Sequence, residues 1–360
     1  MNESAQLRFV MAGGGTGGHV LPLLAVAAEL RRRGHECLFI GTRLGLEARL
    51  APARGFPIEW IDIGGLQRVG LRQSIRTLFQ LPASVARCSR LLSRFRAAAV
   101  FSLGGYAAAP PLLAAILRRV PIAAMEPNAV PGLVTRRFAR FTRRALVQFD
   151  ETRRFFPAGR AELCGLPVRN EFFDIPWRPP GPVFRVLITG GSRGSQTLNR
   201  AAREAFPLLA QAPVHLTVQT GEAEQETTAR AFAAASLSGT VSAFLDDMPS
   251  AYRDSDFVIS RAGAGAVSEL AAAGRPSLLV PFPFAADDHQ RHNAEALARN
   301  GAALVLSDHE LSGARLAQTL LDLRTRPGQL ELMSHAARAH ARPGGAARAA
   351  DILLEVASAH

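Results

Sequence analysis

Short apolar runs alternate along the chain with longer stretches in which apolar residues recur at helical spacing. The run "LRFVMA" is followed by a helix-like stretch at 21–33, which ends before Gly34, and then by the run "CLFIG". The runs "AAVFSLGG" and "PIAAME" come later. Because buried strands read as short apolar runs and surface helices show a helical period, the alternation predicts a parallel sheet covered by helices on both faces.

The same pattern starts again near residue 184. Residues 174–184, "DIPWRPPGPVF", are rich in proline, which is typical of a linker. The next stretch, "FRVLITGGSRGSQTLNRAAREAF", repeats the opening order of strand, glycine turn and helix. Since 360 residues also exceed one typical domain, we expect an α/β protein of two Rossmann-like, doubly wound parallel-sheet domains that face a cleft. The expected divisions are an N-terminal domain at 1–165, a linker at 166–183, a second domain at 184–340, and a C-terminal helix at 341–360 that can pack back on the N-terminal domain.

Residues 97–117 carry no charge and could be mistaken for a membrane span. Two glycines and two prolines interrupt them, so a buried strand, a glycine turn and a helix are expected instead. The N-terminus shows no basic segment followed by an apolar one, so no secretory signal is expected, and the cytosol is the default compartment. The three cysteines lack the spacing of a zinc site or a disulfide framework and are expected to be buried thiols: Cys37, Cys88 and Cys164.

Composition and charge narrow the possible functions. A hydrophobic content of 48% with 20% charged residues excludes a disordered chain. All 42 basic residues are arginines, and they are unevenly distributed. Residues 1–165 hold 24 arginines and 10 acidic residues, a formal charge of +14, whereas residues 166–360 hold 18 and 20, a charge of −2. Such a basic half attracts an anionic polymer or an anionic membrane surface.

The first apolar run leads into "GGGTGGH", a glycine-rich loop before a helix start. Glycines let a ligand approach the backbone closely, and the N–H groups of a helix start can bind an anion such as phosphate. Gly13, Gly15 and Gly18 match the dinucleotide fingerprint G-x-G-x-x-G, which is a weak signal alone. Ligands of open α/β sheets bind beyond the carboxyl ends of the strands. The groups expected at that edge are Thr16–His19, Ser102–Tyr106, Glu126–Asn128, Ser192–Ser195 and Arg261–Glu269.

Each of these groups also has an ordinary structural explanation, such as a tight turn or a loop cap. His19 lies where a helix N-terminus favours a neutral, proton-accepting imidazole, but it could only hydrogen-bond the loop. Glu269 comes about one turn into a predicted helix, where a carboxylate could accept both hydroxyls of a ribose, but it could be an exposed helical glutamate. Acids and histidines at 281–297 lack a second cluster at ligand spacing, so we prefer hydrogen bonding to a hydroxylated ligand over a metal site.

Eight segments, in combination and in this order, resemble the MurG family of peptidoglycan glycosyltransferases, which are two-domain GT-B enzymes. They cover nearly the whole chain: "GGGTGGHVLPLLAVAAEL", "SLGGYAAAPPLLAA", "EPNAVPGLVTR", "GLPVRNEF", "GGSRGSQTLN", "FLDDM", "SRAGAGAVSELAAAGRPSLLVPFP" and "DDHQRHNA". The chain departs from the family at Arg193 and Ser195, where glutamine and alanine are usual.

The resemblance implies that the C-terminal half binds most of the donor, UDP-N-acetylglucosamine (UDP-GlcNAc). It assigns Leu245 to the uracil, Glu269 to the ribose, Ser192 with 264–268 to the diphosphate, and His289 with Gln290 to the sugar. The full implied donor set is Thr16, Gly17, Gly18, Asn128, Arg169, Ser192, Leu245, Ala264, Gly265, Ala266, Val267, Ser268, Glu269, His289 and Gln290. The implied acceptor set is Gly14, Gly15, Gly104, Gly105 and Tyr106.

The reaction implied is attack by the C4 hydroxyl of N-acetylmuramic acid in lipid I on the anomeric carbon of UDP-GlcNAc, with inversion, giving lipid II. His19 is the first candidate for the base and Glu126 the second. Helix N-termini and Arg169 would stabilise the departing diphosphate, so no cofactor and no tightly bound metal are expected. The expected partners are UDP-GlcNAc, lipid I, an anionic membrane surface and other cell-wall synthesis proteins, but not nucleic acid. The expected location is peripheral, on the cytoplasmic face of the inner membrane.

The arginine-rich stretch at 66–96 is the expected membrane contact. A basic amphipathic helix can lie in an anionic lipid interface, although the same spacing is more often used to bury a core helix. The residues predicted to face the membrane are Arg72, Ile75, Arg76, Leu78 and Phe79.

Two other functions remain open from the sequence. One is an NADP-dependent oxidoreductase that uses the first glycine loop, with Arg43 at the 2′-phosphate. It leaves the repeated loop at 190–195 and Glu269 unexplained. The other is a non-catalytic protein whose basic half binds a polyanion or a membrane.

Overall fold

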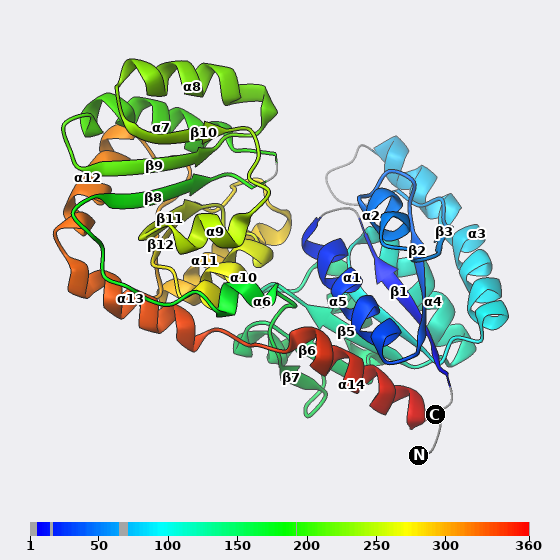
Figure 1. Cartoon of the computed structure of the whole chain (residues 1–360). Helices are drawn as coiled ribbons and strands as arrows, with labels where there is room; N and C mark the ends of the chain where they lie inside the picture. The colour runs from blue at the N-terminus through cyan, green and yellow to red at the C-terminus, as the bar shows by residue number, and fades with distance from the viewer. Residues whose placement is uncertain (1–5, 15–16, 65–70, 192, 360) are drawn as a thin grey trace. The chain divides into compact units, whose positions relative to one another are not determined.

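Each half of the chain folds into a parallel β-sheet with helices on both faces (Figure 1). The computed structural model describes residues 6–14, 17–64, 71–191 and 193–359, and for residues 71–79 the backbone alone. The chain divides into two compact units, of which unit 1 comprises Met1–Pro167 with Gly344–His360 and unit 2 comprises Val168–Pro343. The expectation of two Rossmann-like, doubly wound parallel sheets is confirmed.

Unit 1 is built on a seven-stranded sheet of order β3-β2-β1-β4-β5-β6-β7, in which the strand order reverses between β1 and β4. Its strands are β1 (Arg8–Gly13), β2 (Glu36–Gly41), β3 (Ile58–Trp60), β4 (Ala99–Gly104), β5 (Ile122–Glu126), β6 (Arg144–Val147) and β7 (Ala161–Leu163). Its helices are α1 (Gly17–Arg32), α2 (Glu47–Ala53), α3 (Leu71–Phe95), α4 (Ala109–Arg118), α5 (Leu133–Phe138) and α14 (Gly345–Ser358), with short helices η1 (Tyr106–Ala108), η2 (Ala139–Phe141) and η3 (Asp150–Phe155).

The central strands of unit 1 are apolar throughout because both of their faces are covered. Along β1, Phe9 and Met11 point into a core formed with α1 and α14, whereas Val10 and Ala12 point into a second core formed with α3 and α4. A strand alternates its side chains between two faces, so a continuous apolar run is what two cores require. The expected strand, glycine turn and helix at 97–117 are confirmed as β4, Gly104–Gly105 and α4.

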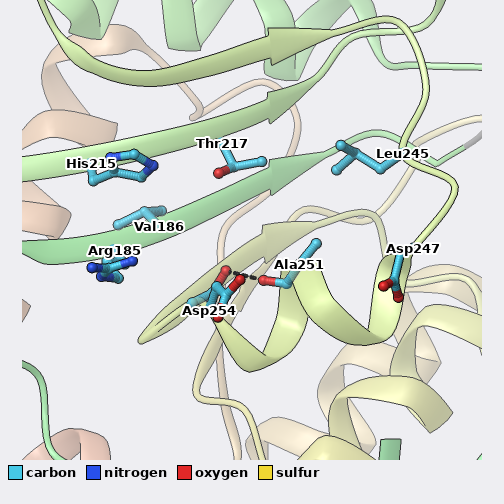
Figure 2. A pocket seen from close by; sticks show the side chains of 9 residues that line it. Arg185, Val186, His215, Thr217, Leu245, Asp247, Ala251 and Asp254 are labelled. Atoms are coloured by element: carbon cyan, nitrogen blue, oxygen red, sulfur yellow. Dashed lines mark hydrogen bonds between the residues drawn. The ribbon is translucent and has the colours of Figure 1, made fainter. Parts of the chain in front are cut away.

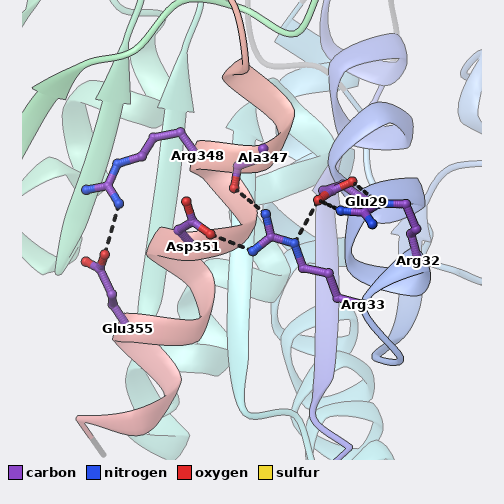
Figure 3. A network of polar contacts seen from close by, with 7 residues as sticks. All are labelled: Glu29, Arg32, Arg33, Ala347, Arg348, Asp351 and Glu355. Atoms are coloured by element: carbon purple, nitrogen blue, oxygen red, sulfur yellow. Dashed lines mark hydrogen bonds and ion pairs between the residues drawn. The ribbon is translucent and has the colours of Figure 1, made fainter. Parts of the chain in front are cut away.

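The C-terminal helix α14 belongs to unit 1, although it follows unit 2 along the chain. Its apolar face, including Ile352 and Leu353, is fully buried in the core that α1 lines. Polar contacts also attach α14 to neighbouring segments, because Arg33, directly after α1, binds Asp351 at 2.5 Å (Figure 3), and Arg348 binds Glu162 of β7 at 2.6 Å. The chain therefore crosses between the units twice, at Pro167 and at Pro343.

Unit 2 repeats the arrangement with a six-stranded sheet of order β10-β9-β8-β11-β12-β13. Its strands are β8 (Phe184–Thr189), β9 (Val214–Gln219), β10 (Ser238–Ser242), β11 (Phe257–Ser260), β12 (Ser277–Leu279) and β13 (Ala303–Val305). Its helices are α6 (Asn170–Phe173), α7 (Gln196–Leu209), α8 (Gln225–Ala234), α9 (Met248–Arg253), α10 (Ala264–Ala273), α11 (His289–Ala298), α12 (Gly313–Arg324) and α13 (Pro327–Ala339), with η4 (Glu222–Glu224) and η5 (Ala286–Asp288).

One face of the second sheet packs on α7, α12 and α13, where Phe184, Val186 and Ile188 of β8 enter the core. The three cysteines are buried and free, as expected, and burial raises the pKa of Cys37 and of Cys88 to about 12. Among the helices of the described residues, none is long and apolar enough to cross a membrane.

Candidate active site

The first two glycine loops of unit 1 pack against each other at the carboxyl ends of β1 and β4. Gly13 pairs with Gly104 after a register shift, and Gly104 and Gly105 have φ angles of +77° and +78°. A side chain on Gly105 would place its Cβ 3.1 Å from the carbonyl oxygen of Gly14. Glycine is required at Gly105 because a side chain would have little room beside Gly14. A positive φ is also strained for other residues.

The predicted base lies in the first turn of α1. That helix starts at Gly17, Gly18 is exposed, and His19 is half-buried. Tyr106 is also half-buried and directly follows the second glycine loop. The predicted site residues Gly15 and Thr16 of the first loop, and Ser192 of the third, lie outside the described residues.

Glu126 ends β5 and is only 2% exposed. Its carboxylate accepts hydrogen bonds from the backbone N–H and the side-chain amide of Asn128, both at 3.0 Å, and further bonds come from Thr135 and from the backbone of Gly132. Burial raises the pKa of Glu126 to about 7, although these hydrogen bonds act in the opposite direction and lower it. The group therefore titrates near neutral pH, in the range of a general base, but is held by its own loop.

The third glycine loop, in unit 2, follows β8 and leads into α7. Gly194 has a φ angle of +71°, and a Cβ there would lie 1.8 Å from the carbonyl oxygen of Thr220. Ser195, which departs from the resembled family, accepts a hydrogen bond from the Leu198 N–H and caps α7. The departure thus supplies a side-chain cap at this helix start.

The N-terminus of α10 offers backbone donors at the carboxyl end of β11. The helix starts after Gly263 without a side-chain cap, so the N–H groups of 264–266 have no acceptor within the helix. Val267 is already bonded through its N–H to the Gly263 carbonyl, and its side chain is fully buried. The Ser268 hydroxyl donates to the Ala264 carbonyl at 2.8 Å. Of the predicted diphosphate residues within α10, Ala264, Gly265 and Ala266 present backbone N–H donors that have no acceptor inside the helix.

Glu269, Asp247 and Arg169 form a charged group in the same unit. Glu269 is half-buried in α10, and desolvation raises its pKa to about 7, opposed by the nearby Arg169 guanidinium. The pKa of Asp247 lies below its usual value, mainly because of hydrogen bonds from Ser250, with smaller contributions from the Arg253 and Arg169 charges. The Arg169 guanidinium stacks on the Phe172 ring at 5.2 Å. One exposed cation therefore lies within electrostatic reach of two carboxylates.

A cavity of about 300 Å³ lies beside this group, between α9 and strands β8 and β9 (Figure 2). Leu245, the predicted uracil contact, lines it together with Asp247. Its other lining residues are Arg185, Val186, His215, Thr217, Ala251, Asp254 and Ser255. None of the other predicted donor residues lines this cavity.

The two residues predicted to contact the sugar begin α11. The His289 ring nitrogen Nδ1 lies 2.6 Å from the Ala286 carbonyl oxygen. The side-chain Oε1 of Gln290 accepts a hydrogen bond from the Phe282 backbone N–H at 3.0 Å. Asn293, one turn later, is fully buried and donates to the carbonyl of Ala262 at 3.2 Å. The start of α11 is thereby tied to the loop that precedes α10.

Several polar residues that support these loops were missed from the sequence. The Thr189 hydroxyl accepts from the Gly191 N–H at 3.1 Å, and Gln219 binds both Thr189 and Gly191. Thr189 and Gln219 each end an apolar run. A search for every polar residue at the end of an apolar run would therefore have identified both. Glu47, a buried carboxylate beside the first glycine loop, has no such signal.

The predicted membrane residues lie on α3, which is helical as expected. Their side chains fall outside the described part of the structure. Across the described residues, no group of three or more His, Cys, Asp or Glu side chains is arranged to hold a metal ion.

Two family models match the chain. Residues 9–147 match the glycosyltransferase family 28 N-terminal domain, and residues 185–349 match the glycosyltransferase family 28 C-terminal domain.

Curated relatives match over almost the full length. A protein of Solibacter usitatus is 53% identical over 97% of this chain and 96% of its own. A protein of Pelobacter propionicus is 40% identical over 89% of this chain and 92% of its own. Both are named UDP-N-acetylglucosamine--N-acetylmuramyl-(pentapeptide) pyrophosphoryl-undecaprenol N-acetylglucosamine transferase.

Solved structures share the fold. The crystal structure of MurG from Acinetobacter baumannii is 31% identical with a TM-score of 0.83, over 97% of this chain and 99% of that one. A UDP-GlcNAc 2-epimerase of Neisseria meningitidis, solved with UDP-GlcNAc bound, has a TM-score of 0.68 at 12% identity, over 97% of this chain and 100% of that one. The latter likeness shows the fold alone.

Proposed function

The chain belongs to glycosyltransferase family 28, and on this basis we propose that it transfers N-acetylglucosamine from UDP-GlcNAc to lipid I. Lipid I is undecaprenyl-diphospho-N-acetylmuramic acid pentapeptide, and the product is lipid II, the precursor of peptidoglycan. The main support for this proposal is 53% identity, over 97% of the chain, to the Solibacter usitatus protein that is named as an N-acetylglucosamine transferase of this kind. Family membership decides against the NADP oxidoreductase and the non-catalytic alternatives.

In this proposal unit 2 binds the donor. The N–H groups of 264–266 at the start of α10 meet the diphosphate, because a helix N-terminus carries partial positive charge and unpaired donors. Glu269 accepts the ribose hydroxyls, and Arg169 adds a positive charge beside it. Leu245 offers its backbone to the uracil, and His289 with Gln290 contacts the sugar.

The acceptor sugar binds at the first two glycine loops of unit 1. The oxygen of the C4 hydroxyl forms a bond to the anomeric carbon, the bond from that carbon to the diphosphate oxygen breaks, and UDP leaves with the electron pair. The hydroxyl proton passes to His19, which is half-buried in the first turn of α1. Glu126 ranks second as the base because its carboxylate already accepts two hydrogen bonds from Asn128. Charge on the leaving diphosphate is met by backbone donors and Arg169, without a resident metal ion.

We place the enzyme at the cytoplasmic face of the inner membrane as a peripheral protein, where a polyprenyl-linked acceptor is met. The basic N-terminal half supports contact with anionic lipid. Other cell-wall synthesis proteins are proposed partners.

The test is a transfer assay with UDP-GlcNAc and a lipid I analogue, followed by release of UDP and by mass of the product. We expect stoichiometric UDP and an added N-acetylhexosamine, and stabilisation of the protein against heat by UDP but not by NADPH. UDP release that needs no acceptor, or stabilisation by NADPH alone, would contradict the proposal.

A further inference from the structure

A buried carboxylate lies beneath the first glycine loop and takes no part in the proposed chemistry. Glu47 is in the first turn of α2 and is 1% exposed. Its Oε1 accepts hydrogen bonds from the backbone N–H of Thr42 at 3.0 Å and from the Thr42 hydroxyl at 3.1 Å. Burying a carboxylate costs free energy that only good hydrogen bonds offset, so an apolar residue would be the cheaper choice at a purely structural position.

Three glycines leave the space that this side chain occupies. A Cβ on Gly14 would lie 2.3 Å from Glu47 Oε1, and one on Gly45 would lie 2.0 Å from Oε2. A Cβ on Gly41, at the end of β2, would lie 2.5 Å from the Glu47 Cγ. The carboxyl group is therefore packed directly against the backbone of three segments, one of which is the first glycine loop.

The same carboxylate is connected to the second glycine loop. The Thr42 hydroxyl, which binds Glu47, also lies 3.4 Å from the hydroxyl of Tyr106. Tyr106 directly follows Gly105, where a Cβ would lie 3.1 Å from the Gly14 carbonyl oxygen. Glu47 therefore packs directly against the first glycine loop, and it is linked to the second loop through the hydroxyl groups of Thr42 and Tyr106.

We infer that Glu47 is a positioning residue, which fixes the first glycine loop and the Tyr106 hydroxyl in the relative geometry that the acceptor sugar requires. The inference rests on the proposed function, and it deepens it on the acceptor side. Glu47 is too buried to touch a substrate, so it acts through the loop and through Thr42. Small errors of placement matter, since a shift of about 1 Å in a reacting group can cost ~10²-fold in rate.

The test compares Glu47→Ala, Glu47→Gln and Thr42→Val by kcat and acceptor KM with a lipid I analogue, by UDP affinity, and by thermal stability. We expect Glu47→Ala to lower kcat/KM for the acceptor by on the order of 100-fold. Glu47→Gln keeps the shape and one accepting oxygen, so it should recover part of the loss. Thr42→Val keeps the backbone N–H bond and removes only the hydroxyl, so its loss should be smaller. UDP affinity, which belongs to unit 2, should stay at the wild-type value in all three.

The matched control is Glu36→Ala, on the same strand as Gly41, where the glutamate is partly exposed and pairs with Arg8 at the surface. It should keep wild-type transfer. A folded Glu47→Gln or Thr42→Val with wild-type kcat and acceptor KM would overturn the inference, and so would a loss that appears equally in UDP affinity. These two variants decide the matter if Glu47→Ala fails to fold. Absence of transfer by the wild type and the control would instead contradict the proposed function.

Discussion

Glu126 and Glu269 share a pKa raised to about 7 but differ in their surroundings. Glu126 is satisfied by its own loop, with hydrogen bonds from Asn128, Thr135 and the backbone of Gly132. The charged group facing Glu269 is Arg169, which favours ionisation against desolvation. Glu126 is thus held within its own loop, whereas Glu269 is the carboxylate that we propose accepts the ribose hydroxyls.

Donor affinity should therefore depend on pH through Glu269. As pH rises through about 7, a larger fraction of this carboxylate is ionised, and an ionised carboxylate accepts ribose hydroxyls more strongly. Calorimetry with UDP-GlcNAc should show affinity rising from about pH 6 to pH 8, and Glu269→Gln should remove that rise. Glu269→Ala should lose roughly 1.5 to 3 kcal/mol for each charge-assisted hydrogen bond. Donor affinity in the variants that matches the wild type at every pH would exclude the ribose role.

Stability should depend on pH through Glu126. A carboxyl group whose pKa rises from 4.5 to about 7 on folding binds more protons when folded, so the free energy of unfolding falls as pH rises across that range. The shift corresponds to roughly 3 kcal/mol. Glu126→Gln should remove this fall, so urea denaturation should show the variant gaining stability relative to the wild type between about pH 5 and pH 8. Parallel stability curves for the two proteins would show that Glu126 is not responsible.

Turnover should depend on His19. Loss of a general base typically costs ~10²- to 10⁴-fold in kcat, so His19→Ala should lower kcat by that order and leave UDP affinity unchanged. Steady-state kinetics beside UDP calorimetry checks both. Near wild-type turnover in a folded His19→Ala protein would move the base assignment to Glu126.

At the scale of elements, α14 is attached to the rest of unit 1 by a buried apolar face and by ion pairs, of which Figure 3 shows the one between Arg33 and Asp351. Arg33, directly after α1, binds Asp351 and donates to the Ala347 carbonyl, while Arg348 binds Glu162 of β7. These ion pairs are at least partly exposed, so each should contribute little, whereas the apolar face should contribute most of the attachment.

Truncation of the apolar face should destabilise unit 1 far more than loss of an ion pair. Leu353→Ala, at a fully buried position, should cost ~2–5 kcal/mol, and Asp351→Ala, with its side chain 45% exposed, about 1 kcal/mol or less. The chain has two tryptophans, so a Trp177→Phe background leaves Trp60 as the reporter of unit 1 in urea denaturation. Equal losses in the two variants would mean that the ion pairs, not the apolar face, hold the helix.

At the scale of the whole molecule, the charge is divided between the two halves of the chain. Residues 1–165 carry +14 and residues 166–360 carry −2. No acidic residue interrupts α3, which contributes five arginines to the basic half. Charge on this scale acts through long-range attraction rather than through individual contacts, and salt screens it.

Binding to anionic vesicles should therefore depend on the N-terminal half. Each arginine near an anionic surface contributes about 1 kcal/mol, so Arg72→Glu with Arg76→Glu should weaken co-sedimentation with anionic liposomes at low salt. The matched control is Arg200→Glu with Arg230→Glu, an equal charge change at exposed arginines of unit 2. Binding that ignores salt and anionic lipid, or that falls equally in both double variants, would exclude α3 as the docking helix.

The sequence by itself determined the strands, the glycine loops, the order of strands and helices along the chain, and the family, because each of these depends on patterns of residues that are close together in the sequence. Apolar runs mark β1 and β8, and the glycines that follow them mark tight turns before α1 and α7. Local patterns of this kind can be recognised from the sequence without knowledge of the three-dimensional structure.

Only the tertiary structure decided which polar groups support the site. Nothing near Glu47 in sequence indicates that its carboxylate lies under a loop more than thirty residues earlier. Arg338 likewise donates to the carbonyls of Phe173 and Ala272, far away along the chain. The helix start at α10 was predictable from its glycines and alanines, but the inward placement of Val267 and Ser268 was not. Buried polar groups take whatever partners the folded chain brings within hydrogen-bond distance, and that choice follows from packing rather than from sequence spacing.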